Sequence, residues 1–124
     1  MRLVVAALCL AGVFAAGSAL AQSQMELNAQ AGADLRKSDQ QLNAVYNRLR
    51  AKISDAGKTS LQTAQQSWLS FRDQECAFET MATAGGSIHS MMVALCLTRL
   101  TDQRVKDLEA QLNCKEGDLS CGGQ

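Results

Sequence analysis

The sequence predicts an all-α fold, a small antiparallel bundle of three main helices with a disulfide-stapled helical hairpin. The 124 residues include no proline, so few positions force a helix to end. Apolar residues recur at intervals of three and four in three separate segments, which is the spacing of one helix face. Five of the nine glycines lie at residues 85–86 and after residue 114, where we expect connections and loops.

The first 21 residues are predicted to be a secretory signal peptide that is cut after Ala21. Arg2 supplies a short positive start, residues 3–16 form an apolar run, and residues 19–21 form a small-x-small cleavage signal. The run is shorter than the roughly twenty apolar residues of a membrane span, so a retained membrane anchor is the weaker alternative.

The segment that remains after cleavage is expected to be one helical domain at residues 22–124. Its core covers about residues 27–112, and residues 114–124 are expected to be a loop-like tail. Cys9 raises the possibility of lipidation, but Leu8 stands where a small residue is needed before a lipidated cysteine. We therefore expect a periplasmic or secreted protein without a lipid anchor.

Charge and composition exclude several function classes. Twelve Lys and Arg balance twelve Asp and Glu, and losing Arg2 leaves eleven against twelve, so there is no strong positive field to attract nucleic acid or a membrane surface. His89 is the single histidine, which excludes sites that need several imidazoles. We expect no nucleic-acid partner and no stable membrane span after signal cleavage.

The first helix is expected at about residues 25–55, with Gly57 ending it as a residue that tolerates positive φ. One side of this helix carries the apolar residues at helical spacing. These residues are Leu35, Leu42, Val45, Tyr46, Leu49 and Ile53.

The second helix is expected to begin at Thr59 or Ser60, either of which can act as N-cap. Its stripe consists of Leu61, Ala64, Trp68, Phe71, Glu75, Phe78 and Ala82. The stripe holds three of the four large aromatic residues outside the signal peptide, so it is predicted to be the centre of the core. Each aromatic ring would stabilise the fold by roughly 2 to 3 kcal/mol when buried. Glu75 interrupts the stripe and, if buried, needs a cationic partner such as Arg72 or Arg99.

The third helix is expected to follow residues 85–86, with Ser87 or Ser90 as its N-cap, and to run to about Asn113. Its apolar positions again recur at intervals of three and four. They are Met92, Val93, Cys96, Leu97, Leu100, Val105, Leu108 and Leu112.

Four cysteines remain outside the signal peptide, and an even number in an exported chain indicates two disulfides. Cys76 and Cys96 lie at similar heights if the second and third helices form a hairpin around Gly85, which favours this pair and the pair Cys114–Cys121. A tail cysteine that reaches Cys76 is the main alternative. No C-x-x-C spacing is present, so we expect no metal site.

Two segments are candidates for chemistry or binding. Asp73, Glu75 and Glu79 lie close together on the second helix, but no second motif supports glycoside cleavage by these carboxylates, so we predict no catalytic residue and no enzyme. At residues 85–89 a glycine pair allows another backbone to approach closely, which suits a loop that enters a partner's cleft. A plain hairpin turn accounts for the same residues.

Ordered motifs recur on all three expected helices. They are Asp39-x-x-Leu42-Asn43-x-x-Tyr46, Leu61-x-x-Ala64-Gln65-x-x-Trp68-x-x-Phe71-Arg72-Asp73-x-x-Cys76, Gly85-Gly86-Ser87, Cys96-Leu97 and Leu100-Thr101-x-x-Arg104. Over about residues 27–112 this order resembles the LprI-type lysozyme-inhibitor-like family of exported bacterial proteins.

The resemblance implies a small helical domain at the periplasm or cell surface, with a structural disulfide between Cys76 and Cys96. We expect no cofactor. It also implies that the protein binds lysozyme and blocks hydrolysis of peptidoglycan. Many members carry a lipid anchor or another cysteine near the start, whereas residues 28–31 here contain no cysteine. The second disulfide and the site of action in this chain can therefore differ from those of other family members.

We expect the partner-binding surface at the end of the hairpin, with an acidic side that suits a basic lysozyme. The residues expected to form it are Asp73, Glu79, Gly85, Gly86, Ser87 and His89. The alternative function is a non-catalytic periplasmic scaffold or envelope-stress protein that binds another envelope protein. Both functions share this fold and these disulfides, so the sequence does not separate them.

Overall fold

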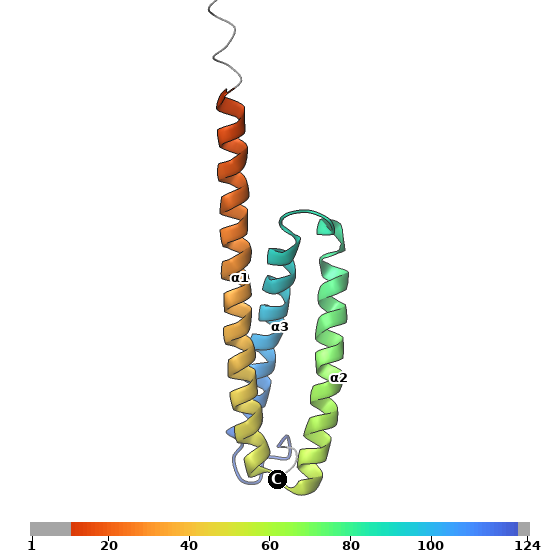
Figure 1. Cartoon of the computed structure of the whole chain (residues 1–124). Helices are drawn as coiled ribbons and strands as arrows, with labels where there is room; N and C mark the ends of the chain where they lie inside the picture. The colour runs from red at the N-terminus through yellow and green to blue at the C-terminus, as the bar shows by residue number, and fades with distance from the viewer. Residues whose placement is uncertain (1–10, 122–124) are drawn as a thin grey trace, which may run out of the picture.

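The computed structural model describes residues 11–121, with side chains described from Ser23 onward (Figure 1). Its elements are three long helices, α1 (Ala11–Lys52), α2 (Asp55–Glu79) and α3 (His89–Leu112), and a short 3₁₀ turn, η1 (Met81–Thr83). This arrangement confirms the predicted all-α class. Residues 1–10 of the expected signal peptide, with Cys9, and residues 122–124 of the tail lie outside the described residues.

Helix α1 is longer than predicted and extends well past the α2–α3 hairpin (Figure 1). It begins at Ala11 rather than near residue 25, so it continues into the expected signal peptide, whose cleavage after Ala21 stays a prediction. It ends at Lys52, and Gly57 does not terminate it as expected. Gly57 is instead buried in the first turn of α2.

The connection between α1 and α2 is shorter than predicted because Ser54 provides the cap. Ser54 has an extended backbone and its Oγ accepts a hydrogen bond from the Gly57 amide at 3.1 Å. The predicted N-cap at Thr59 or Ser60 is therefore wrong. Thr59 lies inside the helix, where its hydroxyl donates to the Asp55 carbonyl at 3.2 Å. Ser54 favours a helix start because its side chain can cap the first turn, and Asp55 favours it because a negative charge is stabilised at a helix N-terminus. The helix therefore begins at this earlier position.

The core lies between α1 and the second half of α3. Its fully buried members are Leu42, Val45, Leu49, Ile53 and Leu108. Half-buried residues from all three helices, Tyr46, Leu61, Trp68, Val105 and Leu112, pack around this cluster. The expected apolar stripe is thus confirmed as buried at four of its six positions, Leu42, Val45, Leu49 and Ile53, and Leu108 is the fully buried residue of α3 that meets them.

Helix α2 faces its neighbours with a different side from the one predicted. Phe71 and Phe78 are 52% and 70% exposed, so the expectation that they form the centre of the core is wrong. Glu75 is only half-buried, so it does not need the cationic partner that a buried carboxylate requires. The side that faces α1 and α3 carries Leu61, Gln65, Trp68, Arg72, Cys76 and Thr80. Polar residues occupy half of this inward stripe, and hydrophobic periodicity therefore did not detect it.

The α2–α3 connection is a series of tight turns. Gly85 has φ +80°, a conformation that favours glycine, and the Gly86 amide donates to the Thr83 carbonyl at 3.0 Å. Ile88 is the N-cap residue of α3 and no side chain caps this helix. The predicted cap at Ser87 or Ser90 is wrong, because the turn that leads from Gly86 to His89 already directs the chain into the helix.

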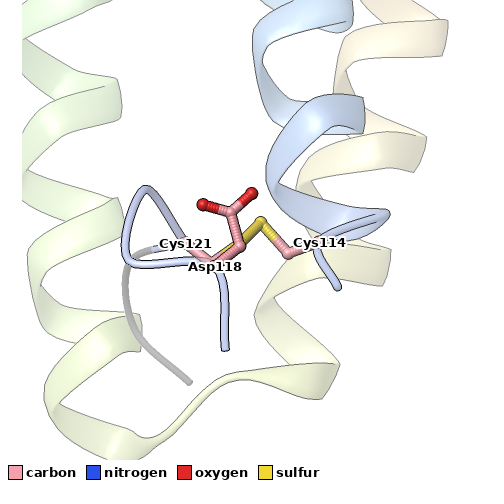
Figure 2. Close-up of side chains that lie close together, drawn as sticks. All are labelled: Cys114, Asp118 and Cys121. Atoms are coloured by element: carbon pink, nitrogen blue, oxygen red, sulfur yellow. A yellow bond between two sulfur atoms is a disulfide. The ribbon is translucent and has the colours of Figure 1, made fainter. Parts of the chain in front are cut away.

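Both predicted disulfides are confirmed. Cys76 and Cys96 join the two arms of the hairpin, with their Cα atoms 5.7 Å apart. Cys114 and Cys121 close a small loop in the tail, with their Cα atoms 5.9 Å apart (Figure 2). The tail lies at the same end of the bundle as the α1–α2 turn (Figure 1) and is tied to α3 by a hydrogen bond from Gln111 to the Ser120 carbonyl.

Candidate functional site

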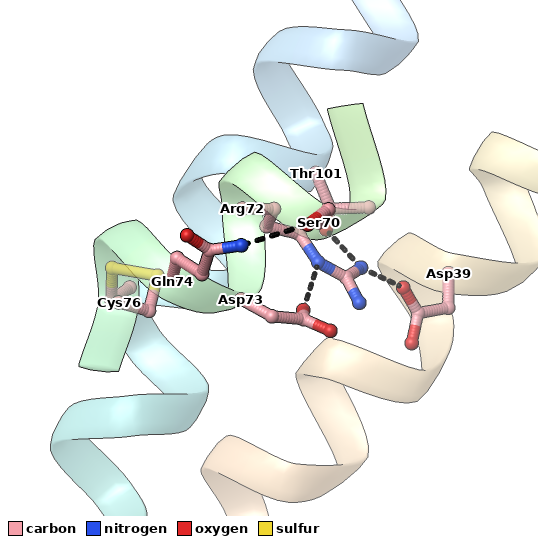
Figure 3. A network of polar contacts seen from close by, with 8 residues as sticks. Asp39, Ser70, Arg72, Asp73, Gln74, Cys76 and Thr101 are labelled. Atoms are coloured by element: carbon pink, nitrogen blue, oxygen red, sulfur yellow. Dashed lines mark hydrogen bonds and ion pairs between the residues drawn. A yellow bond between two sulfur atoms is a disulfide. The ribbon is translucent and has the colours of Figure 1, made fainter. Parts of the chain in front are cut away.

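Arg72 forms a polar junction between the three helices (Figure 3). Its Nη1 donates to Asp39 on α1 at 3.0 Å and to the Thr101 hydroxyl on α3 at 3.1 Å, and its Nε donates to Asp73 at 3.0 Å. Thr101 is completely buried and the Arg72 side chain is only 12% exposed. The junction fixes the position of α2, because its donors and acceptors match in one alignment of the helices.

Trp68 extends this junction toward the second half of α3. The guanidinium carbons of Arg72 and Arg104 lie 5.4 and 5.8 Å from the centre of its ring, within the range of cation–π attraction. Arg104 Nε donates to the Gln65 side chain at 3.0 Å. Burial lowers the pKa of Arg104, because the charged guanidinium loses hydration.

The motif residues of the three helices therefore meet inside the bundle. Asp39, Gln65, Trp68, Arg72, Thr101 and Arg104 all belong to the junction or contact it. Their contacts explain how the three helices align. This convergence was not predicted from the sequence, although the order of the motifs along three antiparallel helices was the available signal.

The hairpin end carries the predicted loop in an exposed position. Gly85, Gly86 and Ser87 are exposed, and the Ser87 carbonyl accepts a hydrogen bond from Asn28 of α1 at 3.0 Å. The Nδ1 atom of His89 lies 2.9 Å from the Thr83 hydroxyl. The loop is thus braced by α1 on one side and by its own turns on the other.

Two of the predicted partner-binding residues line one groove beside this loop. Asp73 and His89 are part of the wall of a groove of about 440 Å³ between α2 and α3. The rest of the wall is mainly apolar and includes Ala77, Met81, Ala84, Val93 and Leu97. Glu79, Gly85, Gly86 and Ser87 are not part of this wall, so the groove brings together only Asp73 and His89 of the six predicted residues.

Two acidic residues of this region, Asp73 and Glu79, each contact an arginine. Arg99 Nη2 lies 2.8 Å from both carboxylate oxygens of Glu79, and Asp73 contacts Arg72 as described above. Their charges are therefore largely compensated at close range. The prominent exposed side chains near the loop are instead apolar, since Phe78 and Met81 are 70% and 67% exposed.

The tail brings together one set of potential metal ligands. The Sγ atoms of Cys114 and Cys121 and a carboxylate oxygen of Asp118 lie within 4.8 Å of one another (Figure 2). Both cysteines are consumed in the disulfide, so neither offers the thiolate that binds a metal. The Asp118 carboxylate accepts hydrogen bonds from the amide and hydroxyl of Ser120, which lower its pKa.

Within the described part of the chain, no helix combines the length and apolar character that crossing a membrane requires. The two disulfides fit an extracytoplasmic location, because thiols stay reduced in the cytosol of most bacteria.

Comparison with known proteins gives a family and a shared fold. A family model described as "Lysozyme inhibitor LprI", an inhibitor family rather than a catalytic one, matches residues 15–108. An uncharacterised protein of Rhizobium meliloti (strain 1021) is 31% identical over 109 residues, which cover 77% of this chain and 78% of that protein. The crystal structure of a DUF1311 family protein from Pseudomonas putida KT2440 matches with a TM-score of 0.65 and 23% identity, covering 73% of this chain and 94% of that chain.

Proposed function

This chain belongs to the family described as lysozyme inhibitor LprI, and we propose that it is an exported bacterial protein that binds lysozyme and blocks peptidoglycan hydrolysis. The match over residues 15–108 is the observation that carries this proposal. In it, residues 1–21 are removed as a signal peptide and the domain at residues 22–124 acts in the periplasm or after secretion. The domain inhibits by binding alone, without a cofactor.

We place the contact surface at the end of the hairpin. Gly85, Gly86 and Ser87 form an exposed loop that is held by turns, by the disulfide behind it and by Asn28. A loop that is already ordered loses little conformational entropy when it enters a cleft. We propose that Asp73, Glu79 and His89 contact lysozyme together with this loop.

The charge pairs around the loop predict how the complex should respond to salt. Because Asp73 and Glu79 each contact an arginine, they add little net negative field at the distances where a basic lysozyme is steered. Exposed apolar side chains, above all Phe78 and Met81, are available for contact in their place. Binding should therefore depend only weakly on ionic strength, which titrations at low and high salt will measure.

The decisive experiment titrates the exported, oxidised protein against chicken-type, invertebrate-type and goose-type lysozymes. Cell-wall hydrolysis and direct binding are followed in the same samples. Saturable, stoichiometric inhibition of one class is the expected result. If no class binds while the fold and both disulfides are intact, the proposal fails and the search moves to an envelope protein that this chain would bind as a scaffold.

Two sets of variants test where lysozyme binds. Phe78→Asp and Met81→Asp place charge on exposed apolar positions beside the loop and should weaken inhibition without unfolding the protein. Leu119→Asp is the matched control, because Leu119 is fully exposed in the tail at the other end of the bundle. The pair Asp73→Lys and Glu79→Lys removes the Glu79 partner of Arg99 and one of the two carboxylates that contact Arg72, which keeps Asp39, and should also weaken inhibition. Unchanged inhibition in both sets would refute this placement.

A further inference from the structure

A separate cavity of about 690 Å³ lies at the end of the bundle opposite the hairpin loop. It is formed by the end of α1, the beginning of α2 and the last turns of α3. Most of its wall is apolar and comes from Leu49, Ile53, Leu61, Ala64 and Leu108. Its volume falls within the range of about 300 to 1,000 Å³ that is typical of small-molecule sites.

Arg104 is the cation in the described wall of this cavity, and it forms no close ion pair with a described residue, although the charge of Asp107 acts on it electrostatically. Its Nε donates to the neutral Gln65 side chain and its guanidinium packs over Trp68, but no carboxylate lies within 4.0 Å of it in the described part of the chain. Arg72 and Arg99, in contrast, each contact at least one carboxylate. The two Nη groups of Arg104 therefore have hydrogen-bond capacity that the described residues do not use.

We propose that the Arg104 cavity binds an amphiphilic anion, with a carboxylate or phosphate group on the Arg104 guanidinium and a single apolar chain along the wall. A guanidinium binds either head group through paired N–H donors, and the bond strengthens where water is partly excluded. The apolar chain gains from leaving water against the leucine and isoleucine side chains. This site is separate from the proposed lysozyme contact and does not depend on it.

Asp107 is the one acidic residue in the described wall, and we expect it to lower the affinity of the cavity for an anion. It is exposed, and its carboxylate accepts a hydrogen bond from Gln103 at 3.0 Å. Its charge opposes an incoming anion, but solvent screens an exposed charge more effectively than a half-buried one. A cationic amphiphile, by contrast, would meet Arg104 inside the cavity and should be rejected.

The test uses the full exported, oxidised protein and four soluble probes with the same chain. Decanoate and decyl phosphate supply the two anionic head groups, decanol is neutral, and decyltrimethylammonium is cationic. Isothermal titration calorimetry below the micelle concentration should show one saturable site for an anion. We expect at least about tenfold tighter binding than for decanol, the effect of one charge-assisted contact. Binding of either anion supports the proposal and identifies the head group.

Variants separate a role in binding from a role in folding. Arg104→Gln should remove the preference for the anion over decanol while leaving decanol binding unchanged, and Arg104→Lys should restore part of that preference. Asp107→Asn should tighten anion binding by about two- to fivefold, because it removes an exposed like charge. A purely structural role of Arg104 would lower the affinity for all probes together.

Filling the cavity provides the second arm of the test. Ala64 is exposed yet lines the cavity, so Ala64→Trp should block all probes, whereas Ala110→Trp on an exposed position of α3 outside the described wall should not. Phe78→Ser tests adventitious binding of the chain to an exposed aromatic residue and should leave affinity unchanged. The proposal is overturned if neither anion binds the folded protein, or if an anion binds Arg104→Gln and Ala64→Trp as well as it binds the wild type.

Discussion

The α1–α3 interface and the attachment of α2 use different kinds of contact. Leu42, Val45 and Leu49 of α1 meet Leu108 of α3, and all four are at most 3% exposed. Helix α2 reaches these helices through the Arg72 junction, the Trp68 ring and the Cys76–Cys96 disulfide. The apolar contacts are non-directional, whereas the polar and covalent ones fix an alignment.

This difference divides two tasks between the regions. Burial of apolar surface supplies most of the free energy of folding, so the α1–α3 interface should determine stability. Matched hydrogen-bond donors and acceptors stabilise one alignment of a helix more than alignments shifted or rotated from it, so the Arg72 junction should determine where α2 lies. The outward side of α2, with Phe71 and Phe78, remains exposed for contact with a partner.

The largest expected effect is at the α1–α3 interface. Leu108→Ala should lower the free energy of unfolding by about 2 to 5 kcal/mol, because Leu108 is 2% exposed and the change leaves a cavity. Urea denaturation followed by circular dichroism measures it. The matched control is Phe78→Ala, which removes a larger side chain but at a position that is 70% exposed. A loss at Phe78 equal to that at Leu108 would restore the aromatic stripe as the core.

The hairpin disulfide should rank next. Replacing both Cys76 and Cys96 with alanine frees a segment with a sequence separation of 20, which should cost about 3 kcal/mol in the chain-entropy model. The Cys114–Cys121 loop has a separation of 7 and should cost less when it is opened in the same way. Denaturant unfolding of the two double variants compares them directly, and the opposite order would contradict a covalent role for the disulfide in holding α2.

The Arg72 junction should contribute less than either. Arg72→Met removes charge-assisted hydrogen bonds to Asp39 and to the buried Thr101 hydroxyl, with an expected cost of about 1.5 to 3 kcal/mol. Arg99→Met is the control, because the exposed Arg99–Glu79 pair should contribute only about 0 to 1 kcal/mol. A double-mutant cycle of Arg72→Met with Thr101→Val should show coupling, and additive effects would show that the junction does not act as a unit.

The sequence predicted the elements that rest on one uninterrupted pattern. The α1 stripe was correct at Leu42, Val45, Leu49 and Ile53, because this helix buries a continuous apolar side. The Cys76–Cys96 disulfide followed from export, an even cysteine count and the hairpin geometry, whereas a tail cysteine bonded to Cys76 stayed the alternative to Cys114–Cys121 until the structure decided it. The exposed loop followed from the glycine pair, of which Gly85 requires positive φ.

The orientation of α2 could not be predicted from periodicity, because two stripes share Leu61 and Trp68 and then diverge. Hydrophobicity favoured Phe71 and Phe78, whereas the structure turns Arg72 and Cys76 inward. One signal was available: residues in a helix are about 100° apart, so Phe78 lies about 200° from Cys76 and cannot face α3 beside it. The arginine partners of Asp39 and Glu79 were not predictable either, because they depend on how the helices align. The Arg104 cavity was not predictable because it forms only where the ends of three helices meet.

The smallest expected effect concerns how α2 begins. Ser54→Ala should cost about 1 kcal/mol, because the Ser54 hydroxyl accepts a hydrogen bond from the Gly57 amide that otherwise lacks a partner within the first turn. Ser60→Ala is the matched control and should stay within about 0.5 kcal/mol, since Ser60 is an exposed residue inside the helix. Both values come from denaturant titrations of the oxidised protein. A greater loss at Ser60 would move the start of α2 to the later position that the sequence favoured and would detach Gly57 from its first turn.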